Sequence, residues 1–254
     1  MIINKNLIEA YEHDRDPSNL AEFALLKNYE APSAMRKEVV KELQTQLEEI
    51  IEEFPTFNQE LWNVLFHQQN SLLNRVIVVP VVGTKDHPIV KQQDQVYLLI
   101  DLIQIANVTP IVHQMTYVMQ NILHTELCKL CIRAVYPFEA QSYQEMLDYS
   151  TFCNGLANFI AWNENAAQYK FYTDKYEPYK ERVFGMLSSA AEVKDKALQH
   201  KILLQATAGD FWNQFPGAAG MFYFDDLYQE YGTQGIFVQY QQGWKHFVSH
   251  IFHE

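Results

Sequence analysis

The sequence predicts an α+β fold that is mostly helical, with one small sheet placed before a long central helix. Two observations lead to this prediction. Between residues 73 and 105 the chain carries β-branched and aromatic runs, whereas most of the remaining chain repeats its apolar residues at helical spacing. In addition, 254 residues with 48% hydrophobic content are enough to bury a substantial core.

The first 72 residues are expected to form a helical region. Apolar residues repeat at helical spacing in Leu7–Tyr11 and Leu20–Tyr29, and the pair Asp16-Pro17 separates these two pieces. The clearest amphipathic helix runs over Ala34–Phe54, where one apolar stripe faces away from Lys, Gln and Glu side chains. A further helix is expected over Asn58–Asn70.

Two strands are expected next. Arg75–Val82 is too rich in β-branched residues for a helix, and Pro80 within it favours an edge strand or a bulge because proline has no backbone N–H. Gly83–Pro88 is the turn that follows, and Gln95–Ile105 is the second strand. We expect these strands to form an antiparallel sheet whose edge Pro80 would protect from further pairing.

A long helix is predicted over Thr109–Cys131. Its first residue suits the N-cap, and Pro110 fits the first helical position. His113 and Tyr117 are four residues apart, so both project from one face of this helix. The pair Tyr136-Pro137 is expected to end it.

The rest of the chain predicts more helices. We expect helices over Ser142–Ala161 and Ala166–Gln205, a break at Pro216–Gly220, and two last helices over Met221–Tyr231 and Ile236–His253. The chain then consists of an N-terminal helical region (1–72), a core with the strands and the 109–131 and 142–161 helices (73–165), and a helical C-terminal lobe (166–254). These parts are expected to pack as one compact unit.

The segment from His113 to Tyr117, HQMTY, resembles the HExxH motif of zinc peptidases. In that motif two His on one helical face bind zinc, and the Glu accepts a proton from the metal-bound water. The first His is kept here, whereas Gln114 replaces the Glu and Tyr117 replaces the second His. Gln114 carries an amide that cannot accept this proton, and the phenol of Tyr117 is a poor zinc ligand beside an imidazole.

A second segment extends the resemblance to the gluzincin type of these peptidases, which take a third ligand from the Glu of an E-G-L-A-x-[YF] run. Here the run is Asn154–Phe159, NGLANF, and Asn154 stands in the place of the Glu. A neutral amide oxygen suits calcium better than zinc. The resemblance covers Val96–Ala161 and implies a zincin-like fold whose site has lost the general base and two of three zinc ligands. No cofactor is expected, and zinc only if other ligands rescue the site.

Composition restricts the partners. The formal net charge of -12 argues against a nucleic-acid surface, which needs clustered positive charge. No run reaches the roughly 18 apolar residues of a membrane span, and the N-terminus shows no targeting pattern, so we expect a cytoplasmic protein without a membrane partner. Three cysteines are an odd count and are expected to be reduced thiols. The remaining partner class is a peptide or a protein whose identity the sequence does not give.

His124, Cys128 and Cys131 suggest a second possible metal site. They share one helical face at positions i, i+4 and i+7. A structural metal would need a fourth ligand such as Cys153. The simpler interpretation is that these cysteines are buried as small apolar residues.

Three functional hypotheses remain open from the sequence. The first is a catalytically degenerate relative of zinc peptidases that binds a peptide or a partner without hydrolysing it. The second is an enzyme with metal-independent chemistry in the same cleft, where His113 would be the base and Tyr117 the acid. The third is a helical interaction protein whose resemblance to peptidases is accidental.

Overall fold

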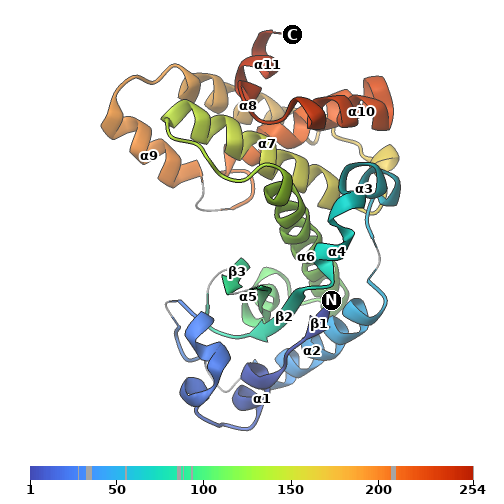
Figure 1. The fold of residues 1–254 in the computed structure, drawn as a ribbon, viewed down its shortest axis with the longest axis vertical. Helices are drawn as coiled ribbons and strands as arrows, with labels where there is room; N and C mark the ends of the chain where they lie inside the picture. Colours follow the sequence, from blue (N-terminus) through green and yellow to red (C-terminus); the bar gives the residue numbers. More distant parts are fainter. Residues whose placement is uncertain are drawn as a thin grey trace. The chain divides into compact units, whose positions relative to one another are not determined.

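The computed structural model describes residues 1–27, 29–32, 36–54, 56–84, 87, 89–92, 94–206 and 210–253 (Figure 1). Most of these residues are helical, and one small sheet lies in the first half of the chain. The predicted α+β class is therefore confirmed.

The sheet has four strands in the order β1-β2-β4-β3, with bounds β1 Ile2–Ile3, β2 Val76–Val81, β3 Ile89–Gln92 and β4 Gln95–Asp101. β2 pairs in parallel with both β1 and β4, and only β3 and β4 are antiparallel. The prediction of an antiparallel sheet was wrong because β3 and β4 form a hairpin whose second strand inserts beside β2. The two-residue β1 was not predicted, since it is too short to show an alternating pattern.

Pro80 lies in a strand with neighbours on both sides, so the prediction of an edge strand was wrong. The backbone N–H of Asn4 donates to the carbonyl of Val78 (2.8 Å), which shows that Val78 turns its backbone groups toward β1. Pro80, two residues further, faces the same side. β1 has already ended at Ile3, so the missing N–H of Pro80 costs the sheet no hydrogen bond.

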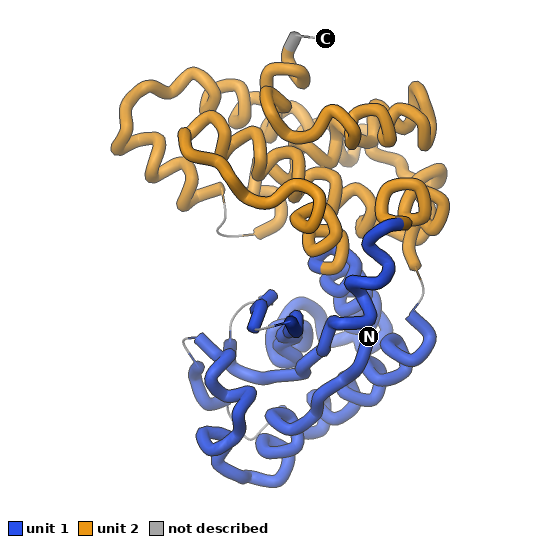
Figure 2. Tube along the Cα trace, in the orientation of Figure 1, with its two compact units in different colours: residues 1–55, 68–126 blue, residues 56–67, 127–254 orange. Residues whose placement is uncertain are grey.

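The chain divides into two compact units, coloured in Figure 2: residues 1–55 with 68–126, and residues 56–67 with 127–254. We call them unit 1 and unit 2. Unit 1 contains the sheet, and unit 2 is built from helices in the described residues. The predicted boundaries after residues 72 and 165 do not coincide with this division, which runs through one long helix.

Short helices cover the sheet of unit 1. α1 (Asn6–Glu12) packs on β2, and α2 (Lys37–Glu52) packs on β1 and on α5 (Leu102–Val108). The segment Leu20–Tyr29, which was predicted as helical, forms the 3₁₀ turn Ala21–Leu25. The apolar core of this unit contains Leu7, Leu25, Ile77, Val79, Val81 and Leu99.

The strand predicted to reach Ile105 ends at Asp101. The buried carboxylate of Asp101 accepts hydrogen bonds from the backbone N–H groups of Ile103 (2.9 Å) and Gln104 (3.1 Å), so Asp101 caps α5. The same carboxylate accepts the backbone N–H of Thr84 (2.6 Å) from the turn after β2. A capping residue directly after an apolar strand therefore overrides the β-branched pattern that follows it.

The long helix α6 runs over Val112–Val135, whereas the sequence predicted Thr109–Cys131. Thr109 ends α5 in an extended conformation, and its hydroxyl accepts the N–H of Ile111 (3.2 Å) instead of capping α6. The helix ends before Tyr136, as predicted.

Unit 2 is assembled around α7 (Tyr143–Ala161), whose bounds match the prediction closely. Ser142 and Glu145 form a capping box at its start. The other helices of the unit are α3 Gln59–Phe66, α8 Glu177–Ala191, α9 Lys196–Ala206, α10 Phe215–Gln242 and α11 Phe247–His253. The predicted helix 58–70 is split. α3 ends at Phe66, and the chain continues through a 3₁₀ turn into α4 (Asn70–Leu73).

Asn58 attaches α3 to the other helices of unit 2. It has a left-handed backbone (φ 50°, ψ 50°), and its side-chain NH₂ donates to the carbonyls of Ile160 (2.8 Å) and Asn163 (2.9 Å). Its side-chain oxygen accepts the backbone N–H of Ala166. One buried amide thus satisfies three backbone groups that lie about a hundred residues away in sequence.

The predicted break at Pro216–Gly220 was wrong, because this segment forms the first turns of α10. Pro216 sits in the first turn, where proline needs no hydrogen-bonding N–H. The small residues allow α10 to pack closely on α7: a Cβ added to Gly220 would lie 2.1 Å from the carbonyl oxygen of Thr151. The interruption comes later instead, at Gly232 with φ 61° and at Gly243 with φ 77°.

This contact predicts opposite effects for two glycine substitutions. Gly220→Ala should lower the free energy of unfolding by about 2 to 3 kcal/mol, because the backbone of α7 would have to move away. Gly185→Ala in α8 is the matched control, since a Cβ there would meet nothing within 4 Å. It should raise stability by about 0.5 to 1 kcal/mol. Equal effects of the two substitutions in urea denaturation would contradict the close contact.

Candidate functional site

Three of the residues that resemble the peptidase motif lie exposed on α6. His113 and Tyr117 are one turn apart, and Tyr117 is 37% exposed. Gln114 between them is also exposed, and its side-chain oxygen accepts a hydrogen bond from the hydroxyl of Thr109 (2.6 Å). The predicted helix is therefore present and exposes the imidazole and the phenol to solvent.

Asn154 lies on α7 and is half-buried. Its side-chain NH₂ donates to the hydroxyl of Ser150 one turn earlier (3.1 Å). The resemblance to peptidases implies that the side chains of His113, Tyr117 and Asn154 converge. His113 and Tyr117 belong to unit 1 and Asn154 belongs to unit 2, so this convergence stays a prediction.

The donors at these positions do not fit zinc. They comprise one imidazole, one phenol and an amide that is engaged with a serine hydroxyl, whereas zinc sites of peptidases combine imidazoles with a carboxylate. In the part of the chain that the structure describes, no three His, Cys, Asp or Glu side chains are grouped in a way that could hold a metal ion.

The second candidate set, His124 with Cys128 and Cys131, is buried in the protein. The Nδ1 of His124 lies 2.7 Å from the carbonyl oxygen of Gln120 and must carry the proton, because a carbonyl only accepts. The ring also stacks on Phe54, with ring centroids 4.5 Å apart. Burial raises the pKa of Cys131 to about 12, which opposes the thiolate that a metal would require.

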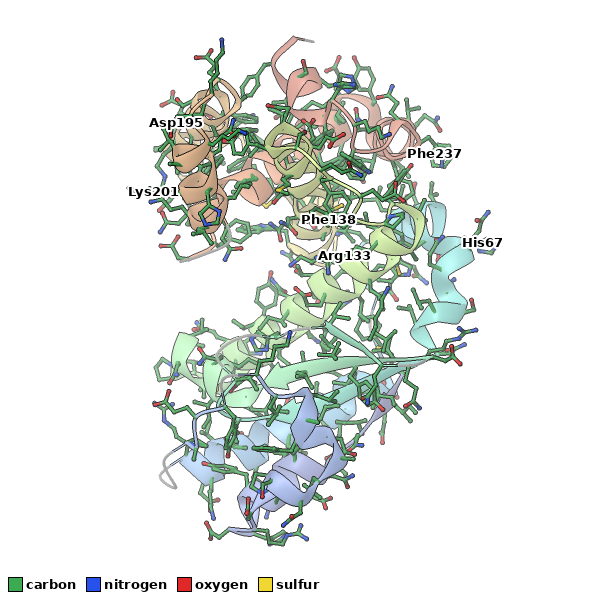
Figure 3. All side chains as sticks on the ribbon, turned by 60° about the vertical axis from the view of Figure 1, so that its left-hand side comes forward. His67, Arg133, Phe138, Asp195, Lys201 and Phe237 are labelled. Atoms are coloured by element: carbon green, nitrogen blue, oxygen red, sulfur yellow. The ribbon has the colours of Figure 1, made fainter. Side chains whose placement is uncertain are left out.

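A pocket of unit 2 was not predicted from the sequence. It has a volume of about 500 Å³ and lies between the end of α6, the middle of α7, the end of α9 and the start of α10. Arg133 at the end of α6 and Phe138 in the segment after it, both labelled in Figure 3, are among its lining residues. Asn154 is among its lining residues, so the NGLANF segment contributes to a binding-sized cavity.

The polar part of this pocket centres on the hydroxyl of Tyr149. The hydroxyl donates to the carbonyl of Tyr136 (2.9 Å). Burial and the nearby Cys153 raise the pKa of Tyr149, and the nearby Arg133 lowers it in part. Burial raises the pKa of Cys153 to about 12, and the nearby Arg133 and Lys129 lower it only in part. The thiol is therefore protonated at neutral pH and is not a thiolate nucleophile.

The sequence contains a partial signal for this pocket. Met146, Ser150 and Cys153 follow each other at helical spacing in a segment correctly predicted as a helix, so one shared face could have been identified. Arg133 and Pro216 join them only through the packing of separate helices, which helical periodicity does not reveal.

Two buried carboxylates were also missed. Asp148 accepts the backbone N–H of Val248 (2.9 Å) at the start of α11, and burial raises its pKa. Asp225 on α10 is only 3% exposed and accepts a hydrogen bond from the side chain of Gln229 (3.2 Å). Burial raises the pKa of Asp225 to about 6, and the neighbouring charge of Asp226 acts in the same direction.

Comparison with known proteins adds no assignment: no family model, no curated protein and no solved structure matches the chain. Among the described residues, none of the helices combines the length and the apolar character needed to cross a bilayer.

The buried Asp225 predicts a pH-dependent stability. Its pKa is higher in the folded protein than in the unfolded chain, so its stabilising contribution is full below about pH 4 and is lost as the pH rises through about 6. Asp225→Asn should therefore raise the free energy of unfolding by about 1 to 3 kcal/mol at pH 8 and change it little at pH 4.

Asp226→Asn is the control for this measurement. Asp226 is 53% exposed and paired with Lys180 (2.7 Å), so its removal should change stability by less than about 1 kcal/mol. Denaturant titrations at both pH values provide the comparison. A destabilising Asp225→Asn at pH 8 would show that the carboxylate is needed in its charged form.

Proposed function

We propose that this chain is a non-hydrolytic, peptide-binding relative of zinc peptidases. The resemblance of HQMTY and NGLANF to the peptidase segments supports a zincin-like origin. The replacements at Gln114, Tyr117 and Asn154 remove the general base and two zinc ligands, each of which the hydrolytic chemistry needs. A peptidase-like protein that keeps the substrate groove but lacks the hydrolytic groups would bind a peptide without hydrolysing it.

One observation carries the proposal, namely the edge strand β3. It is the last strand in the order of the sheet and pairs antiparallel with β4 on one side. Its residues Ile89–Gln92 include no proline, and Lys91 and Gln92 are exposed. Pro80, expected to block such an edge, lies in β2. An extended peptide could therefore add to β3 through main-chain hydrogen bonds.

A second candidate function rests on the exposure of His113. An enzyme that used His113 as a base and Tyr117 as an acid would need both groups within reach of water and one helical turn apart, and both conditions are met. Turnover lost in both His113→Gln and Tyr117→Phe would favour this candidate over the binding protein.

The proposal predicts that the purified, tag-free protein holds far less than one equivalent of zinc and cleaves no peptide. Metal analysis and a fluorogenic peptide mixture provide the measurement. The triple substitution Gln114→Glu, Tyr117→His and Asn154→Glu should restore zinc binding, because it rebuilds the ligand set. One equivalent of zinc in the natural sequence, lost on His113→Ala, would overturn the proposal. A triple variant that is folded but binds no zinc would count against the zincin-like origin.

If a peptide adds to β3 as a strand, every second backbone N–H of the peptide should donate a hydrogen bond to β3. To test this, peptides selected from a library of extended ten-residue sequences would be N-methylated at one residue at a time. Methylation at alternate positions should weaken binding about fivefold to tenfold, because each removes one hydrogen bond to the edge strand. The intervening positions serve as the internal control and should change little. Losses that repeat every three or four residues would identify a helical ligand instead.

A further inference from the structure

The pocket of unit 2 has an apolar wall. Six of its described lining residues are apolar and come from four parts of the chain: Phe138, Met146, Leu147, Leu203, Ala206 and Pro216. Its volume of about 500 Å³ lies in the range of small-molecule sites and is sufficient for a linear chain of about twelve carbons. Burying such a chain contributes roughly 0.8 kcal/mol per CH₂ group.

The charge at the pocket is positive, although the whole chain has a net charge of -12. Arg133 is the charged side chain among the described lining residues, and none of these residues carries a carboxylate. Lys129, one turn before Arg133 on α6, is the second cation that acts on Cys153. Arg133 is itself exposed, and an apolar pocket beside an exposed guanidinium is complementary to a ligand with one anionic group.

The other polar groups of the pocket favour reversible binding. The thiol of Cys153 is protonated at neutral pH, so it forms no covalent bond with a ligand at an appreciable rate. The amide of Asn154 and the hydroxyl of Ser150 are hydrogen-bonded to each other. Few polar groups therefore remain for a sugar or another ligand that needs many hydrogen bonds.

Helix α9 forms one wall of the pocket. It supplies Leu203 and Ala206, of which Ala206 is buried and Leu203 is partly exposed. A chain bound in the pocket would bury more of Leu203.

We propose that this pocket binds an acyl or alkyl chain that ends in one anionic group, as in a medium-chain fatty acid, with Arg133 pairing to the carboxylate. This site goes beyond the proposed peptide binding at β3. It lies in unit 2, so its failure in a test would leave the proposal for unit 1 unchanged.

The test uses the full chain and four twelve-carbon probes at monomeric concentrations: dodecanoate, dodecyl phosphate, dodecanol and dodecylamine. Titration calorimetry should show the tightest binding for dodecanoate and at least about tenfold weaker binding for dodecylamine. Equal affinities for all four probes, or no binding by dodecanoate up to millimolar concentration, would overturn the proposal. A much tighter dodecyl phosphate would overturn the assignment to a carboxylate and identify a phosphate ligand.

Variants test the charge of Arg133 and the volume of the pocket separately. Arg133→Gln should weaken dodecanoate about tenfold or more and leave dodecanol unchanged. Lys201→Gln on α9 is the matched control, because Lys201 is exposed and is not among the lining residues (Figure 3). Ser150→Phe should fill the cavity and weaken both probes. Thermal unfolding of each variant verifies the fold, and a folded Arg133→Gln protein with unchanged dodecanoate affinity would refute the role of Arg133.

Discussion

The close contact between α7 and α10 is the constraint on which unit 2 depends. At Gly155 and Gly220 the two helices approach so closely that an added Cβ would lie 2.6 Å and 2.1 Å from the backbone of the partner helix. This approach aligns Phe152 on α7 with Phe224 on α10, and both rings also contact Phe247 on α11. Edge and stacked contacts of this kind add to the energy of apolar burial. The packing of these aromatic rings therefore depends on the two glycines.

The same contact places the start of α10 beside the NGLANF segment. A Cβ at Gly217 would lie 3.0 Å from the Cβ of Asn154, and the preceding Pro216 lines the pocket together with Asn154. The peptidase-like segments and the pocket thus share one residue, Asn154. In the peptidases this position carries a charged ligand, whereas here a neutral amide is engaged with Ser150.

Local patterns in the sequence predicted the elements better than their arrangement. The predicted helix Ser142–Ala161 and the predicted strand Arg75–Val82 match α7 and β2 almost to the residue. The sheet order was not predictable, because β2 pairs with β4 and not with the next strand β3, and because β1 joins β2 from the start of the chain. The motif placed His113 and Tyr117 on one exposed helical face. It could not predict Arg133 as a pocket residue, because Arg133 meets the residues of α7 and α9 only after the helices have packed.

The division into units has a consequence for modularity. The chain passes between the units at residues 55/56, 67/68 and 126/127, so neither unit is a continuous piece of sequence. A fragment that starts at residue 127 would lack Asn58 and would leave the carbonyls of Ile160 and Asn163 without their donor. No single cut yields two self-sufficient halves. A gene fusion, a split reporter or a recombination event that divides the chain at one point would therefore leave at least one unit without part of its sequence.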